Sequence, residues 1–129
     1  MFNFFGKRMK KMMQSRSCSR LSYNLVSFER AKQMIDSQEV VLIDVRSKKE
    51  YDSMHIVNAI NIPLDELKQG KYNLSYECKI MPYCSTGTRT KAAIEYFNRN
   101  GFSNVYIWEY AALVTFPYKN MLVYNKGNI

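Results

Sequence analysis

Two short apolar runs, each preceded or followed by a segment with helical periodicity, constrain the fold of this chain most. Residues 40–45 (VVLIDV) and 79–83 (KIMPY) have the length and continuous hydrophobicity of strands that are buried on both faces. Residues 27–37 (SFERAKQMIDS) and 89–101 (RTKAAIEYFNRNG) carry apolar residues along one side at helical spacing. Strands that alternate with helices predict an α/β fold around a parallel sheet.

Shorter elements complete this predicted order. They are a helix over residues 47–54 with Ser47 as its cap, a strand over 59–62, a helical turn over 63–68 with Pro63 at its first position, and a strand over 104–108. Pro82 inside the run 79–83 departs from a standard central strand, because proline has no N–H for the ladder. Whether the last residues add a strand or wrap around the body stays open.

The length of 129 residues predicts one domain. The positive charge is concentrated at the N-terminal end of the chain. Residues 1–20 contain no acid and supply +6 of the net charge of +8, through Lys7, Arg8, Lys10, Lys11, Arg16 and Arg20. We therefore predict a basic arm over residues 1–20, either frayed or partly helical, and a single domain over residues 21–129. The phenylalanines among residues 2–5 and this basic cluster also suit contact with an anionic lipid surface or an acidic partner. Nucleic acid is not an expected partner, since the basic and aromatic interleaving does not continue into the body.

The three cysteines, Cys18, Cys78 and Cys84, do not form a disulfide framework for a domain of this size. They indicate a reducing, cytoplasmic setting. No apolar run approaches the roughly 20 residues of a membrane-spanning helix, and the N-terminus does not have the order of a secretory signal. No metal-ligand spacing is present, so neither a metal nor a cofactor is expected.

The candidate catalytic residue is Cys84, which the run 79–83 delivers to the carboxyl end of a strand. Ligands bind at that end of an open parallel sheet. Backbone N–H groups of the following loop and the positive end of the next helix can together stabilise an anion. A thiol in this setting ionises readily, and the thiolate is the nucleophile. The alternative is that Cys84 is a small buried hydrophobe. The predicted site residues are Cys84, Ser85, Thr86, Gly87, Thr88 and Arg89.

Two stretches of the chain resemble the rhodanese-like (sulfurtransferase) domain. Residues 42–67 (LIDVRSKKEYDSMHIVNAINIPLDEL) are similar to the N-terminal signature of that family, and residues 81–108 (MPYCSTGTRTKAAIEYFNRNGFSNVYIW) are similar to its active-site loop and following elements. The resemblance implies an open parallel sheet with helices on both faces. It implies that Cys84 carries sulfane sulfur as a persulfide, which it receives from a small anionic donor such as thiosulfate and passes to cyanide, a thiol or a protein acceptor.

The resemblance also assigns supporting residues. Asp44 and Arg46 match an Asp-x-Arg motif and are expected to form a structural ion pair near the site. Glu50 and His55 match further signature positions, and a structural hydrogen bond is expected for His55, the single histidine. The six-residue loop from Cys84 to Arg89 is one residue shorter than in phosphatase and arsenate-reductase relatives, which disfavours these two activities.

The sequence departs from the family pattern at several positions. Met54 and Asn58 stand where glycine is frequent, and Ser85 stands where many relatives that use thiosulfate have a basic residue. Glu109 and Tyr110 stand at the expected place of a Gly-Gly pair. A carboxylate near the mouth of the site would repel a dianion, which favours a small persulfide or a protein as the donor. The alternative function is a binding or redox-sensing module that does not turn over.

Overall fold

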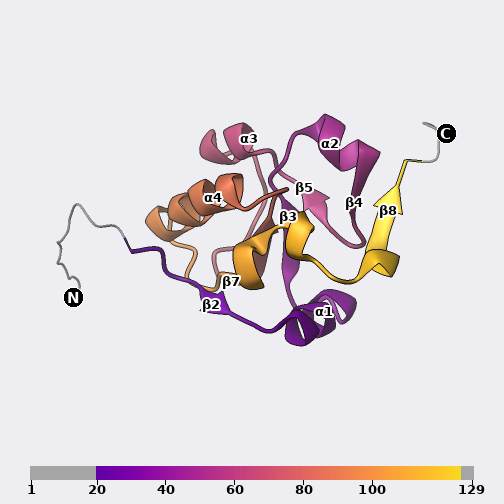
Figure 1. Ribbon diagram of the computed structural model, residues 1–129. Coiled ribbons are helices and arrows are strands. Elements are labelled where there is room, and N and C mark those ends of the chain that lie inside the picture. Colours follow the sequence, from indigo (N-terminus) through magenta and orange to yellow (C-terminus); the bar gives the residue numbers. More distant parts are fainter. Residues whose placement is uncertain (1–19, 126–129) are drawn as a thin grey trace.

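The structure, a computed structural model, describes residues 20–125, and its centre is a parallel sheet (Figure 1). Strand β3 (Val41–Asp44) lies between β5 (Ile60–Asn61) and β6 (Ile80–Tyr83), and both neighbours run parallel to it. A second parallel pair joins β2 (Asn24–Leu25) to β7 (Tyr106–Ile107). A parallel bridge between Ile80 and Val105 links this pair to β6. The α/β class and the parallel sheet are therefore confirmed.

Pro82 lies where the ladder between β6 and β7 is interrupted. On that side of β6 the Ile80 amide donates to the Asn104 carbonyl at 2.9 Å and the Cys84 amide donates to the Ala111 carbonyl at 3.2 Å. Pro82 stands between these two donors and has no N–H to offer. The other side of β6 keeps its full pairing with β3, so the proline costs no hydrogen bond there.

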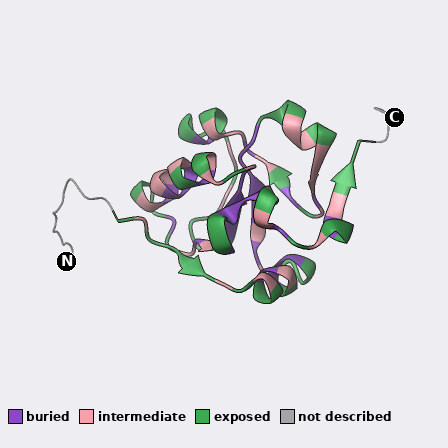
Figure 2. Ribbon diagram, in the orientation of Figure 1, coloured by how far each residue is buried: buried purple, intermediate pink, exposed green. Residues whose placement is uncertain are grey.

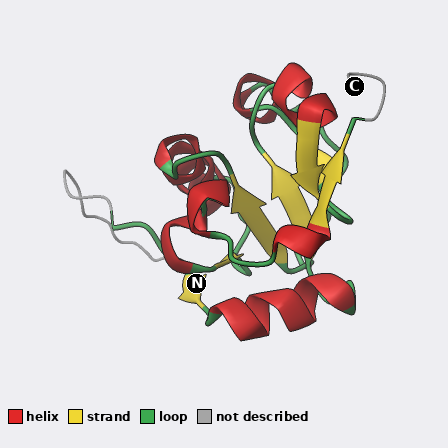
Figure 3. Ribbon diagram, turned by 45° about the vertical axis from the view of Figure 1, so that its right-hand side comes forward, coloured by secondary structure: helices red, strands yellow, loops and turns green. Residues whose placement is uncertain are grey.

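Helices cover both faces of the sheet (Figure 1, Figure 3). Helix α1 (Phe28–Asp36) lies on one face, and α3 (Leu64–Lys68) and α4 (Thr88–Arg99) lie together on the other, while α2 (Lys48–Ser53) follows β3. Two buried clusters result, one on each face. Ile43 and Val45 pack with residues of α3 and α4, and Leu42 packs with residues of α1. The central strands are accordingly buried, as Figure 2 shows.

The helix boundaries follow the local sequence. The Ser27 hydroxyl caps α1 by accepting from the Arg30 amide at 3.0 Å, and Ser47 caps α2 as predicted. Pro63 is the residue before α3 rather than the first residue within it. The helical periodicity predicts one apolar side with Ala92, Ala93, Tyr96 and Phe97. Ala93 and Phe97 are buried in α4, together with Thr90 and Ile94.

The C-terminal part of the described chain wraps the domain and ends in a strand. Three short 3₁₀ turns lead to it: η1 (Glu109–Ala111), η2 (Leu113–Thr115) and η3 (Lys119–Met121). Strand β8 (Leu122–Tyr124) then pairs antiparallel with β4 (Met54–Ile56). This pairing answers the question that the sequence left open about the last residues.

Nearly all of the predicted basic arm, including Cys18, lies outside the described residues, as do residues 126–129. Its predicted contact with an anionic surface therefore stays a prediction. Within residues 20–125, none of the helices has the length and apolar character needed to cross a membrane.

Candidate active site

The predicted nucleophile lies at the junction of β6 and α4. Cys84 directly follows β6, and α4 begins four residues later at Thr88. Residues 85–87 turn back so that the Gly87 amide donates to the Cys84 Sγ at 3.0 Å. Cys84 is 1% exposed. The sulfur is thus held beside the N-terminus of a 12-residue helix, where the helix dipole favours negative charge.

Gly87 is required at this turn for two reasons. Its φ of 102° lies in the left-handed region, which side chains disfavour. A Cβ atom there would also lie 2.7 Å from the Tyr110 carbonyl oxygen. The loop is further tied to the segment after β7, because Leu113 and Val114 donate to the carbonyls of Cys84 and Ser85 at 2.8 and 3.2 Å. The active loop therefore takes its shape from a segment that lies about 25 residues away in the sequence.

Tyr110 and Ala111 have the conformation that suits glycine. Their φ angles are 67° and 49°, both in the left-handed region. Of the two residues at the expected place of the Gly-Gly pair, Glu109 and Tyr110, only Tyr110 has a left-handed backbone. Tyr110 is the residue whose backbone packs against Gly87.

Arg89 makes a bidentate ion pair that the sequence did not predict. Its two terminal nitrogens donate to the two carboxylate oxygens of Glu50 at 2.7 and 3.0 Å. Arg89 lowers the pKa of Glu50 to about 2, chiefly through these hydrogen bonds. In return, Glu50 raises the pKa of Arg89, and the negative charge of Cys84 adds to that effect. Arg89 is therefore within electrostatic reach of the sulfur, while its guanidinium is bound to a carboxylate.

Asp44 and Arg46 form the predicted ion pair, and the pair is buried. The shortest contact, from Arg46 Nη2 to Asp44 Oδ2, is 2.8 Å. Arg46 also donates to the Met54 carbonyl, and its own amide donates to Asp44 Oδ1 at 2.9 Å. The Tyr83 hydroxyl donates to Asp44 Oδ2 at 2.9 Å and accepts from the Ile56 amide at 3.1 Å. These two hydrogen bonds hold Tyr83, which is the residue before Cys84, in place. Burial raises the pKa of the Tyr83 hydroxyl.

The segment between α2 and β5 also bears on the sequence predictions. His55 Nδ1 lies 2.8 Å from the Tyr51 carbonyl oxygen, and the two rings stack with centroids 3.8 Å apart. The structural hydrogen bond predicted for His55 is thus present. Asn58 adopts a φ of 71°, which asparagine tolerates better than most residues. The turn therefore keeps a glycine-like backbone without glycine.

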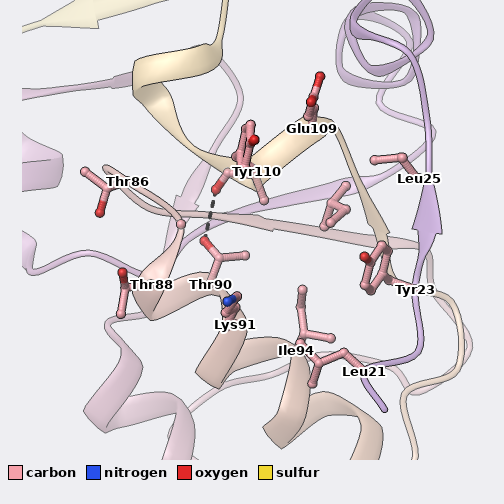
Figure 4. Close-up of a pocket in the computed structure, with 13 residues that line it drawn as sticks. Leu21, Tyr23, Leu25, Thr86, Thr88, Thr90, Lys91, Ile94, Glu109 and Tyr110 are labelled. Carbon is pink, nitrogen blue, oxygen red and sulfur yellow. Dashed lines mark hydrogen bonds between the residues drawn. The ribbon is translucent and has the colours of Figure 1, made fainter.

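A pocket of about 450 Å³ adjoins the loop on the side of β2 and α4 (Figure 4). Thr86 and Gly87 of the loop line one part of it, and apolar side chains such as Leu21 and Ile94 line another. The carboxylate of Glu109 lies at its edge and points away from the other labelled side chains in Figure 4. Cys84 is not among the residues that line this pocket. The hollow is therefore next to the active loop without opening on the sulfur.

These features define what the site can do chemically. The Cys84 sulfur accepts a hydrogen bond at the start of α4, and Arg89, which is ion-paired with Glu50, lies within its electrostatic reach. Residues 20–125 contain no group of three or more His, Cys, Asp or Glu side chains arranged to hold a metal ion. The arrangement suits nucleophilic chemistry of a thiolate.

Comparison with known proteins identifies the family. The family model described as Rhodanese-like domain matches residues 27–127. The chain belongs to the rhodanese-like domain family. This rhodanese-like chain is 34% identical over 84 residues to the tRNA uridine(34) hydroxylase of Yersinia pestis, and 33% identical to that of Photorhabdus laumondii. Each alignment covers 60% of the chain and 24% of the relative, so the chain spans about a quarter of the length of these curated relatives.

Solved structures of rhodanese-like proteins have the same fold. A rhodanese-related protein of Thermoplasma volcanium matches with a TM-score of 0.62 and 26% identity, over 73% of this chain and 90% of that one. A protein of Bacillus halodurans matches with a TM-score of 0.64 and 26% identity, over 81% of this chain and 79% of that one. The predicted rhodanese-like fold is thereby confirmed.

Sequence reasoning named Glu50 without its partner Arg89 and gave Tyr83 no role, and this rhodanese-like site includes both residues. Cys84 to Arg89 form one continuous loop, and Asp44 and Arg46 lie at the end of the neighbouring strand. Glu50 binds Arg89 of the loop, and Tyr83 binds Asp44 at the end of β3. The spacing of Ser47 and Glu50 was the local signal for the position of the Glu50 side chain, because S-x-x-E is the pattern of a capping box. No comparable local signal marks Tyr83.

Proposed function

We propose that this chain is a sulfurtransferase that carries sulfane sulfur as a persulfide on Cys84. The observation that supports it most directly is the Gly87 N–H aimed at Cys84 Sγ from the start of α4. Donors that point at a sulfur stabilise the thiolate before reaction and the negative terminal sulfur after it. Family membership supports the same chemistry.

In the loading half-reaction, the Cys84 thiolate attacks the sulfane sulfur of a donor. With thiosulfate, the S–S bond of the donor breaks and sulfite leaves with the bonding electron pair. With an organic persulfide, the outer sulfur is transferred and the thiol of the donor leaves as a thiolate. In both cases the product on the enzyme is a Cys84 persulfide.

In the unloading half-reaction, an acceptor attacks the outer sulfur of that persulfide. Cyanide leaves as thiocyanate and a thiolate leaves as a new persulfide, and the Cys84 thiolate is regenerated in each case. No external general base is needed when Cys84 is already ionised. His55, which is bound to the Tyr51 carbonyl and stacked on the Tyr51 ring, has no step to perform in this scheme.

The hydroxylase activity named for the tRNA-modifying relatives is not carried over. The chain covers 24% of those proteins. The sulfurtransferase proposed for this chain concerns only the reaction at Cys84 of the rhodanese-like domain.

The intact mass of the purified protein tests this proposal. We expect incubation with thiosulfate or with glutathione persulfide to add the mass of one sulfur atom, and cyanide to remove it. A Cys84→Ser variant should gain nothing, and a Cys78→Ser variant should behave as the wild type. If neither donor adds sulfur to the wild type, the alternative of a binding or redox-sensing module is favoured and the sulfurtransferase is rejected.

A further inference from the structure

The two oxygens of the Glu50 carboxylate have different sets of partners. Oε1 accepts from the Ser47 amide at 3.1 Å, from the Ser47 hydroxyl at 3.0 Å and from Arg89 at 2.7 Å, whereas Oε2 accepts from Arg89 alone at 3.0 Å. The Ser47 contacts are one half of the capping box of α2. Glu50 thus connects the helix after β3 to the arginine that ends the active loop. The hydrogen bonds from Ser47 orient the Glu50 carboxylate that binds Arg89.

Within residues 20–125, both arginines near the active loop are ion-paired. Arg89 is neutralised by Glu50 and Arg46 is neutralised by Asp44. Lys91 lies on α4 and lines the adjoining pocket, which does not include Cys84. Attraction of an anion to the sulfur therefore depends on backbone N–H groups and the dipole of α4. Such groups supply partial charges, and these match a dianion less well than a free guanidinium does.

We propose that Glu50 determines the choice of sulfur donor by holding Arg89 away from the donor anion. This inference rests on the proposed sulfurtransferase function and deepens it. Thiosulfate is a dianion and its leaving group, sulfite, keeps two charges next to the bond that breaks. An organic persulfide releases a thiolate with a single charge at that position. The Glu50–Arg89 pair thus favours the persulfide as donor.

The capping box allows a clean substitution. Either Glu or Gln is suited to the third residue of a capped helix, so Glu50→Gln removes the charge and keeps a side-chain acceptor for the Ser47 amide. A matched control is Ser47→Ala, which removes the hydroxyl that donates to Glu50 Oε1 but keeps both charges of the Glu50–Arg89 pair. A second control is Asp52→Asn, which removes a charge from the same helix where it contacts Lys48 at 3.1 Å.

The experiment measures the rate of sulfur loading on Cys84 with thiosulfate and with glutathione persulfide, at one ionic strength. We expect Glu50→Gln to raise kcat/KM for thiosulfate about fivefold, the scale of a partly exposed charge pair, mainly through a lower KM. The persulfide reaction should change by less than about twofold, which is within the usual effect of a substitution away from the reacting bond. Ser47→Ala and Asp52→Asn should leave the ratio of the two donors unchanged.

A second readout does not depend on turnover. In a Cys84→Ser background, Glu50→Gln should bind sulfite more tightly than the parent, by a similar factor, in a calorimetric titration. An unchanged donor ratio together with unchanged sulfite affinity overturns the inference, as does an equal change in Ser47→Ala. Failure of the proposed function is a different result, because the wild type then loads from neither donor while sulfite binding still reports on Glu50.

Discussion

Two arginine–carboxylate pairs lie near the active loop, and they differ in their exposure to water. The side chains of Asp44 and Arg46 are 0% and 6% exposed, whereas those of Glu50 and Arg89 are 36% and 38% exposed. Both pairs have a contact of 2.8 Å or less. Distance alone therefore does not tell what each pair does. Burial makes the first pair part of the scaffold and leaves the second in contact with water.

The surroundings of the two pairs support this division. The Asp44–Arg46 pair is enclosed by polar partners that satisfy it, including the Tyr83 hydroxyl and the Met54 carbonyl. The Asn61 side chain also donates to the carbonyls of Asp44 and Arg46, both at 3.0 Å. A buried pair with so many partners is costly to break, because the group left behind is charged and without water. The Glu50–Arg89 pair is screened by solvent and contributes little to stability.

The largest effect is expected from Asp44→Ala. This change leaves the Arg46 guanidinium buried without its counter-ion and removes an acceptor from Tyr83. We expect a loss of about 3–5 kcal/mol in the free energy of unfolding, measured by urea denaturation. Asp36→Ala, which breaks the surface pair of Asp36 with Lys32, is the control and should cost less than about 1 kcal/mol. Similar losses of unfolding free energy in Asp44→Ala and Asp36→Ala would contradict the structural role of the buried Asp44–Arg46 pair.

A smaller loss is expected from Tyr83→Phe. The ring is retained, but the Ile56 amide and Asp44 Oδ2 each lose a buried partner. An unsatisfied buried polar group costs about 1–3 kcal/mol, and we expect a loss of that size in urea denaturation. Tyr51→Phe is the control for removing a hydroxyl that is bound to a carbonyl in a less buried place. A Tyr83→Phe protein as stable as the wild type would show that the hydroxyl is not part of the scaffold.

Glu50→Gln should change stability less than either of these substitutions. The exposed pair that it breaks is worth less than about 1 kcal/mol, and the helix cap is retained. Thermal and urea denaturation of the variant should therefore nearly coincide with those of the wild type, even though the choice of donor changes. A loss as large as that of Asp44→Ala would assign Glu50 to the scaffold.

The smallest effect is a dependence of stability on acid pH. The pKa of Glu50 is lowered from 4.5 to about 2 in the folded protein, so its charged form stabilises the fold above its ordinary pKa. This contribution is lost as the pH falls from about 4.5 through about 2. The difference in unfolding free energy between wild type and Glu50→Gln should be constant near neutral pH and shrink over that acid range. A difference that does not vary with pH would mean that Arg89 does not stabilise the charged carboxylate.

Much of the fold follows from local patterns in the sequence. The apolar runs 40–45 and 79–83 predicted the two central strands, the periodicity of residues 27–37 predicted α1, and Ser47 predicted the start of α2. Such signals act over a few residues and are visible without the rest of the chain. The Asp44–Arg46 pair was expected from the resemblance to the rhodanese-like family, and it too joins residues that are close in the sequence. The placement of Cys84 at a helix N-terminus is likewise a consequence of local order.

Only the tertiary structure decided which distant groups meet around the sulfur. Glu50 and Arg89 are 39 positions apart, as are Asp44 and Tyr83, and each meeting depends on the parallel pairing of β3 with β6. The left-handed backbone at Tyr110 and Ala111 likewise follows from packing against Gly87, and no local preference of tyrosine or alanine predicts it. The sequence by itself determined the central strands, the main helices and the candidate nucleophile, because periodicity and capping are short-range. The charge around that nucleophile was decided by strand order, because it depends on which side chains the sheet brings together.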